Sequence, residues 1–248
     1  MMLYQIHMDI GSEGLLYIYK SKQVVTIVKK VDCGAETEHT PAIAWFAFQP
    51  FRVNSILWST AYYMYATTTP LREGALIQIA SHTEMQLRPG WTYPFVDGLF
   101  GSIPGQGDTY NTVNKFPDWK QDLAFGLTQQ VSVNNVQTSG PLNAVPVPLN
   151  KTAAFAPTET VSIFLSEAEN TRSGTVIGKI PAGALTTTLS GAQPDIHVSF
   201  DDRTHTFVLA GRMTQTPAEF AKRLVLASGE PRDLSIASGA TEEQTVMR

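Results

Sequence analysis

The chain of 248 residues has a mass of 27.1 kDa and a formal net charge of −4. Its lysines and arginines are scattered, apart from Lys20, Lys22, Lys29 and Lys30, so it lacks the basic face that neutralises nucleic-acid phosphates, and no nucleic-acid partner is expected. Hydrophobic residues make up 43% of the sequence, which excludes a largely disordered chain.

The N-terminus and the cysteine content predict a soluble, cytoplasmic protein. The first twenty residues lack the basic region, apolar run and cleavage site of a secretory signal. Cys33 is the only cysteine, whereas loop-rich β proteins outside the cell usually contain disulfides. No apolar run reaches the roughly 18 residues that a membrane helix needs, and contact with a membrane is not expected.

The first thirty residues predict a β-hairpin. Segments 14–20 (GLLYIYK) and 23–30 (QVVTIVKK) are rich in residues that favour strands, and Ser21 and Lys22 form a short connection between them. The nearby lysines are interpreted as charges that keep an edge strand from aggregating. A phosphate-binding patch is the alternative interpretation.

Three more strands are predicted in residues 42–48, 53–66 and 75–81. The second of them has apolar residues on both faces, so it is expected to be covered on both sides or to line a pocket on one. Residues 123–137 resume an alternating pattern, and the proline-rich residues 139–157 are expected to form a connection or an edge.

The last third of the chain predicts short strands and then one helix. Residues 159–210 contain five short apolar segments, and residues 201–204 (DDRT) form a hairpin turn between the last two. Thr216 is a candidate N-cap for a helix over 217–226, with Pro217 at its first position and Glu219 at its third. The polar tail 229–248 has no clear structure of its own.

Together these elements predict a mainly β protein, namely an antiparallel, jelly-roll-like β-sandwich with one short C-terminal helix. We expect an N-terminal lobe (1–136), a proline-rich connection (137–158), a C-terminal lobe (159–228) and a tail (229–248). A single continuous domain fits the pattern equally well. Association into a homo-oligomer stays open, because a neighbouring subunit could hold the tail.

Several common chemistries are absent from the sequence. No serine lies in G-x-S-x-G and no histidine in H-E-x-x-H, and the glycine-rich residues 105–107 and 174–180 lack positions that nucleotide-binding loops require. Five candidate cation ligands lie between residues 32 and 39, but no further ligand is identified by spacing, so an exposed acidic turn is preferred. No cofactor and no metal are expected. The five candidates are Asp32, Cys33, Glu36, Glu38 and His39.

The remaining histidines are isolated in the sequence. His7, His82, His197 and His205 are interpreted as strand residues that hydrogen-bond to their neighbours. His205 is preceded by Asp201 and Asp202 at a hairpin tip, where the three could form an acid/base group. Aspartates that favour turns explain this arrangement without chemistry.

Residues 88–122, called the flap below, form the segment in which a site is expected. They contain five glycines, four prolines and seven aromatic rings in 35 residues without a helical or strand period. Long irregular connections are typically functional or disordered, and the rings supply enough apolar area for packing. We expect a folded cover over a pocket. The alternative is that the rings simply complete the core.

Polar residues between the rings favour a small-molecule or glycan ligand, because rings supply contact area and polar groups fix orientation. The inner face of 53–66 is expected to complete the pocket. The expected ligand-binding residues are Trp58, Trp91, Tyr93, Asp97, Phe100, Asp108, Tyr110, Asn111, Asn114 and Trp119.

An enzyme is the alternative function. A cofactor-independent cyclase or isomerase would hold its substrate in an aromatic cavity and transfer protons through Asp97, Asp108, Tyr62 or His82. Calcium held by three flap aspartates, including Asp118, and membrane anchoring by Trp91 and Trp119 are weaker alternatives.

Overall fold

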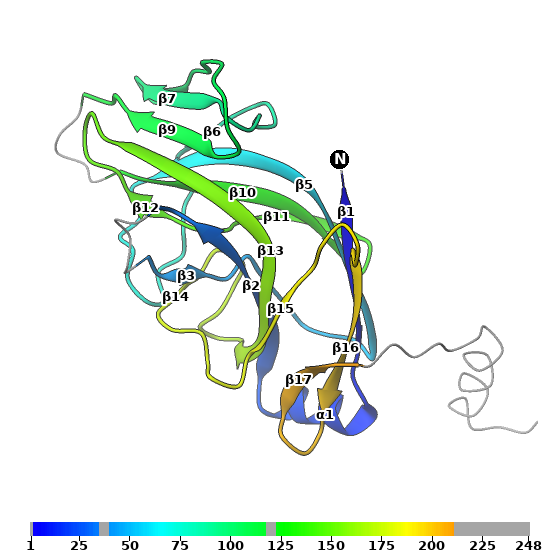
Figure 1. The fold of residues 1–248 in the computed structure, drawn as a ribbon. Helices are drawn as coiled ribbons and strands as arrows, with labels where there is room; N and C mark the ends of the chain where they lie inside the picture. Colours follow the sequence, from blue (N-terminus) through cyan, green and yellow to red (C-terminus); the bar gives the residue numbers. More distant parts are fainter. Residues whose placement is uncertain (1, 35–39, 118–122, 211–248) are drawn as a thin grey trace, which may run out of the picture. The chain divides into compact units, whose positions relative to one another are not determined.

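The computed structural model of the chain describes residues 2–34, 40–117 and 123–210 (Figure 1), which fall within one compact unit, Met1–Gly211. The protein is mainly β, as predicted, with several mixed sheets, one of which curls into a half-barrel. Among the described residues, no helix is long and apolar enough to span a bilayer. The helix expected over 217–226 and the tail 229–248 lie outside the described residues.

The larger sheet joins the first strand of the chain to strands from near its end (Figure 1). Its strand order is β11 (Val136–Pro141), β10 (Ala124–Val133), β5 (Val53–Thr67), β1 (Leu3–Asp9), β16 (Asp195–Asp201) and β17 (Thr206–Leu209). Two short strands pair with members of this sheet outside that order: β12 (Val145–Pro146) pairs with β10, and β6 (Ser81–His82) pairs with β5.

The second sheet is built around the long strand β13 (Thr152–Glu167), which begins inside the expected proline-rich connection. Its strand order is β4 (Phe46–Phe48), β2 (Gln23–Asp32), β13, β9 (Tyr110–Asn114), β7 (Thr92–Val96) and β8 (Leu99–Phe100). Outside that order, the strand β15 (Leu185–Thr188) pairs with β13. A small third sheet pairs β3 (Ala42–Ile43) with β14 (Val176–Ile177).

The expected all-antiparallel arrangement is wrong at two places. β1 pairs in parallel with β16, and β7 pairs in parallel with β9. The first of these pairs places residues of the expected N-terminal lobe beside residues of the expected C-terminal lobe within one sheet. Periodicity reports which face of a strand is buried, but it carries no information on the direction of the neighbouring strand.

The expected hairpin of the first thirty residues is also wrong, because its first half is the helix α1 (Ser12–Lys20). The residues that α1 buries are Gly14 and Ile18, four positions apart, so they lie on one helical face. Glu13 in the first turn and Lys20 in the last turn both complement the helix dipole. Lys22 then adopts a left-handed conformation, with φ of 53°, before β2 begins.

Tertiary packing explains why a segment with strand-forming residues folds as a helix. A Cβ atom on Gly14 would lie 2.3 Å from Asp202 Oδ1 and 2.5 Å from Phe200 Cδ1, so only glycine lets the β16–β17 hairpin approach this closely. The Asp202 carboxylate thereby lies beside the N-terminal turn of α1, where a negative charge is favourable. The hairpin turn predicted at 201–204 is confirmed by a hydrogen bond from His205 N to Asp201 O, 2.8 Å long.

The other predicted strands are confirmed in part. β2, β5 and β10 occupy predicted positions, but residues 75–81 contribute only Ser81 to a strand, and Leu76 forms an isolated bridge with Thr175. The first half of β5 alternates between buried and exposed residues. Its second half is buried on both faces, with Met64 in the main core and Tyr65 in a smaller cluster.

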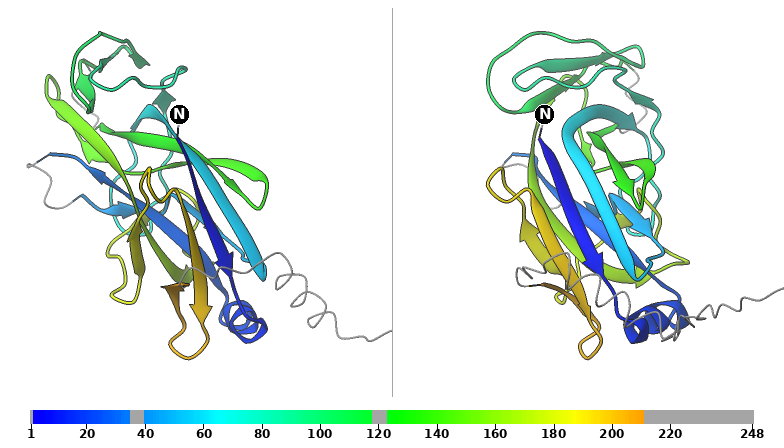
Figure 2. Two further views of the ribbon diagram at one scale, coloured as in Figure 1. Left: turned by 45° about the vertical axis from the view of Figure 1, so that its right-hand side comes forward. Right: turned by 90° about the vertical axis from the view of Figure 1, so that its right-hand side faces the viewer.

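The main hydrophobic core is formed by residues of both large sheets. Figure 2 shows the strands of these sheets from two further sides. Aromatic residues supply much of it, including Trp45, Trp58, Phe125 and Phe155, which are all at most 2% exposed. Fully burying such side chains contributes on the order of 2 to 3 kcal/mol each. One charged side chain, Lys29, lies among them with 1% of its surface exposed.

Candidate functional site

The aromatic rings of the flap pack mainly into the core. Tyr93, Phe95 and Tyr110 are buried, and Phe100 and Phe116 are half-buried against the same cluster. The ring centroid of Phe95 lies 4.8 Å from that of Phe100 and 5.8 Å from that of Phe116. These rings therefore stabilise the end of the protein that β7, β8 and β9 form.

Two asparagines and one tryptophan of the flap interact within the chain. The Asn114 side chain donates to Val147 O, 2.8 Å away, and the Asn111 side chain donates to Trp91 O, 3.3 Å away. The face of the Trp91 ring lies 4.8 Å from the Arg88 guanidinium carbon.

Two of the expected acidic groups are exposed. Asp97 occupies the turn between β7 and β8 with a positive φ of 50°, and Asp108 lies in the loop before β9. His82, another catalytic candidate, places Nδ1 3.0 Å from Thr83 O. In the part of the chain that the structure describes, no hydrogen bond or ion pair joins these three side chains to one another. Asp118 and Trp119 lie outside the described residues.

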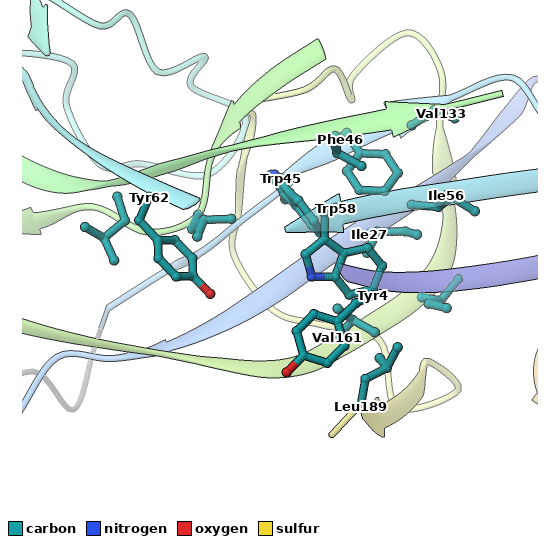
Figure 3. Packing of buried hydrophobic residues seen from close by; sticks show 14 of the residues in the cluster. Tyr4, Ile27, Trp45, Phe46, Ile56, Trp58, Tyr62, Val133, Val161 and Leu189 are labelled. Carbon is teal, nitrogen blue, oxygen red and sulfur yellow. The ribbon is translucent and has the colours of Figure 1, made fainter. Parts of the chain in front are cut away.

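The structure does bring together three of the expected residues, Trp58, Tyr62 and Tyr110. They meet near Glu159 of β13, a residue that the sequence did not single out. Trp58 Nε1 donates to Glu159 Oε2 over 2.7 Å, and Tyr62 OH donates to Glu159 Oε1 over 2.8 Å. The rings of Tyr62 and Tyr110 lie 5.5 Å apart. In Figure 3 the Tyr62 hydroxyl and the Trp58 nitrogen point into the same region of the core.

Lys29 is the cation at the centre of this group. Its ammonium donates to Glu159 Oε2 over 2.7 Å, to Gln129 Oε1 over 2.9 Å and to Tyr62 OH over 3.2 Å. Three hydrogen bonds use all the donors of an ammonium group. We call this group the Lys29 cluster; it consists of Lys29, Trp45, Trp58, Tyr62, Gln129 and Glu159.

Aromatic rings surround the ammonium of Lys29. Its Nζ lies 5.4 Å from the ring centroid of Trp45, 5.6 Å from that of Trp58 and 5.2 Å from that of Tyr62. Each such contact contributes up to about 2 kcal/mol when the cation is desolvated. The rings thus offset part of the large cost of removing a charge from water.

Burial lowers the pKa of Lys29 from 10.5 to about 8, although the nearby Glu159 carboxylate acts in the opposite direction. Burial also raises the pKa of the Tyr62 hydroxyl, and the negative charge of Glu159 raises it further. Tyr62 therefore stays protonated and serves as a hydrogen-bond donor. Burial, followed by Glu159, raises the pKa of Tyr4 in the same way.

A bulge in β13 positions Glu159. The pairing of β13 with β2 shifts register between Pro157 and Val161, so Glu159 leaves the regular ladder. Pro157 cannot donate a ladder hydrogen bond, which is why proline inside strands occurs at such irregular places. The Glu159 side chain keeps 12% of its surface exposed, whereas the side chain of Lys29 has none exposed.

The chemistry available to the Lys29 cluster is proton transfer among an amine, a carboxylate and a phenol. Among the described residues, every buried side-chain nitrogen and oxygen has a hydrogen-bond partner. The polar atoms of the cluster are therefore occupied by one another, apart from Gln129 Nε2, which donates to Ser59 O. A reaction at this place requires a substrate that displaces one of these hydrogen bonds.

A surface hollow of about 450 Å³ lies elsewhere, between the turns at 73–76 and 169–175. A Cβ atom on Gly178 would lie 2.4 Å from Glu73 Oε2, so the glycine leaves room for that carboxylate. Within the described part of the chain, neither the Glu73 carboxylate nor the Arg172 guanidinium has a hydrogen bond or ion pair. The lining residues are Glu73, Gly74, Leu76, Glu169, Asn170, Arg172 and Thr175.

A second hollow, of about 170 Å³, lies beside α1, where the rings of Tyr17 and His205 stack at 3.7 Å. Its volume is below the roughly 300 Å³ at which small-molecule sites usually begin. None of the residues that line either hollow belongs to the flap.

Lys29, Gln129 and Glu159 were not predicted from the sequence as a group. Lys29 was interpreted as an edge charge, although its strand is flanked by β4 and β13 and is therefore internal. The available signal was a pair of lysines, Lys29 and Lys30, at the end of a mostly apolar run, residues 24–28. Glu159 and Gln129 are ordinary polar residues in the sequence, and nothing there connects them to Lys29.

Comparisons with known proteins found no match: no family model, no curated protein and no solved structure is similar to this chain.

Proposed function

We propose that this protein is a carbohydrate-binding β-sandwich module that takes a neutral sugar in the hollow between Glu73 and Arg172. The observation that carries the proposal is a pair of oppositely charged side chains inside a hollow of about 450 Å³, neither of which has a hydrogen bond or ion pair with another described residue. This volume falls within the range of roughly 300 to 1,000 Å³ that is typical of small-molecule sites.

The side chains in the hollow match the hydrogen-bonding pattern of a sugar. A sugar hydroxyl both donates and accepts, so it pairs with carboxylates on one side and with a guanidinium or an amide on the other. Glu73 supplies acceptors and Arg172 supplies donors. Glu169 contributes a second carboxylate, whose charge is balanced by Lys22 at 3.5 Å. With these charges balanced, a neutral ligand suits the hollow better than an ion.

The flap has a different role in this proposal from the one predicted. Its rings hold β7, β8 and β9 against the core, while the ligand binds near the third, small sheet. The hollow has no aromatic platform, so hydrogen bonds supply most of the binding energy, and the affinity is expected to be modest.

The test is to titrate the protein with D-glucose, D-galactose and D-mannose, with D-glucosamine and D-glucuronate as charged comparisons. Binding is measured by calorimetry and by thermal denaturation. At least one neutral sugar should bind and raise the melting temperature. Arg172→Ala and Glu73→Gln should abolish binding, whereas the charge-matched surface variants Arg203→Ala and Glu84→Gln should retain it. Binding that survives in Arg172→Ala, or the absence of binding by every sugar, would overturn the proposal.

One observation favours the enzyme alternative, in which Lys29 acts as an amine base or nucleophile. An amine whose pKa is lowered to about 8 is partly neutral and nucleophilic near physiological pH. The test is acetylation of the native protein with acetic anhydride, followed by mass spectrometry. Lys29 should react at a rate comparable with the exposed Lys30 if substrates reach it. Protection of Lys29 until the protein unfolds would assign the amine a structural role.

A further inference from the structure

Two histidines at opposite ends of the described sequence lie side by side on the larger sheet. His7 of β1 and His197 of β16 are direct register partners in a parallel pair. Asp195 lies two residues before His197, so its side chain projects from the same face of the sheet. His7 and the residues of this face alternate with buried neighbours, such as Ile6, Met8 and Val198.

The donor atoms of these three residues are close together. The two imidazole rings stack with centroids 4.7 Å apart and an angle of 17° between their planes. His7 Nε2 lies 3.9 Å from Asp195 Oδ2, and one donor atom from each of the three residues lies within 4.8 Å of the others. Ligands about 2.0 to 2.2 Å from a tetrahedral ion are roughly 3.3 Å apart, and imidazole nitrogens bind in the plane of their ring, so the two stacked rings must rotate toward one another to close the site.

The site has the rigidity and the access that a bound ion needs. β1 lies between β5 and β16, and buried side chains on its other face fix it in place. The side chains of His7 and Asp195 are 36% and 56% exposed, so they can rotate and an ion can enter from solvent. The neighbouring Gln5 side chain donates a hydrogen bond to Ser55 Oγ, 3.1 Å away, and is not one of the three donors.

We propose that His7, Asp195 and His197 bind a divalent transition-metal ion, with Zn²⁺ as the ion tested. Two imidazoles and one carboxylate favour zinc and its transition-metal neighbours, whereas Mg²⁺ and Ca²⁺ prefer a full set of oxygen ligands. Water completes the coordination. The bound ion links β1 to β16 and stabilises the native state, because the three ligands meet only when the sheet is formed. This proposal is independent of sugar binding.

The test is a titration of the full chain, without a histidine tag, by ZnCl₂. Calorimetry should show one saturable site per chain, and the melting temperature should rise with the Zn²⁺ concentration. In two-dimensional NMR spectra, the imidazole signals of His7 and His197 should shift, while those of His82 and His205 should not.

Variants distinguish this site from adventitious binding. His7→Ala and His197→Ala should each lose the saturable site, and Asp195→Asn should weaken it. His82→Ala, which removes an exposed histidine from elsewhere on the protein, should bind Zn²⁺ like the unmodified chain, and MgCl₂ should have no effect. The proposal is wrong if the unmodified chain does not bind Zn²⁺, or if the double variant His7→Ala/His197→Ala binds it with unchanged affinity.

Discussion

The larger sheet carries two polar groups on its opposite faces, and they differ in how their hydrogen bonds are used. On the inner face, Trp58 and Tyr62 of β5 join the Lys29 cluster, in which the buried polar atoms are all hydrogen-bonded within the protein. On the outer face, His7 of β1 is partly exposed and His197 of β16 is exposed. The sheet therefore carries a closed group that holds the fold together on one face and an open group that can accept an ion on the other.

The difference follows from solvation. An unpaired polar atom inside the core lowers the stability of the folded protein by about 1 to 3 kcal/mol, and an unpaired charge lowers it more. The inner group is therefore compatible with a stable fold only when all of its hydrogen bonds are formed. On the outer face, water satisfies any atom that the protein leaves free. We therefore expect substitutions in the Lys29 cluster to change stability and substitutions in the outer group to change binding.

The largest effect is expected from Glu159→Ala, which leaves the Lys29 ammonium buried without its carboxylate. Removing one partner of a buried ion pair typically destabilises a protein by about 3 to 5 kcal/mol. Urea denaturation would measure this loss. Glu169→Ala, which removes an exposed glutamate, is the matched control and should cost less than about 1 kcal/mol. A loss for Glu159→Ala as small as that of the control would show that Lys29 does not depend on this carboxylate.

The next effect is a dependence of stability on pH. The pKa of Lys29 is about 8 in the folded protein and 10.5 as its ordinary value, so between these pH values the unfolded chain binds more protons. Stability relative to Lys29→Met should therefore rise from pH 8 to pH 10.5, by about 3 kcal/mol at most.

The comparison with Lys29→Met is needed because other groups act in the opposite direction. Burial raises the pKa of Cys33 to about 11, which by itself lowers stability as the pH rises from 9. This contribution is common to both proteins and cancels in the difference between their unfolding free energies. A difference that is constant from pH 7 to 10 would contradict the lowered pKa of Lys29.

A smaller effect is expected from Tyr62→Phe, which removes only the hydroxyl that Lys29 and Glu159 share. The loss of a buried hydrogen bond to charged partners should cost about 1 to 2 kcal/mol. Tyr63→Phe is the matched control, since Tyr63 is half-buried and its hydroxyl forms no hydrogen bond with another described residue. Chemical denaturation of both variants would show whether the Tyr62 hydroxyl contributes more than its neighbour.

The smallest effect on stability is expected on the outer face. Without added metal, His7→Ala and His197→Ala should each change the unfolding free energy by no more than about 0.5 kcal/mol, as is usual for surface substitutions. The same denaturation assay measures this. A loss comparable with that of Glu159→Ala would mean that the stacked imidazoles are part of the fold, and the contrast between the two faces would disappear.

The sequence determined the class of the protein and many of its strands. Alternation and β-branched residues identified most of β2, β5 and β10, and the apolar residues on both faces of 53–66 correctly indicated a strand that is partly covered on both sides. These signals are local, because burial of one or both faces imposes a period on each strand separately. The sequence also showed that aromatic rings are concentrated in the flap. It did not show whether these rings cover a ligand or fill the core.

Only the tertiary structure decided which residues meet. The packing of Gly14 against the β16–β17 hairpin made a helix of residues 12–20, and the parallel pairing of β1 with β16 placed His7 beside His197. Lys29 and Glu159 come together because β2 and β13 are neighbours across a bulge. Each of these contacts joins residues that are far apart in the chain, and their physical cause, complementary packing in three dimensions, leaves no period or spacing in the sequence.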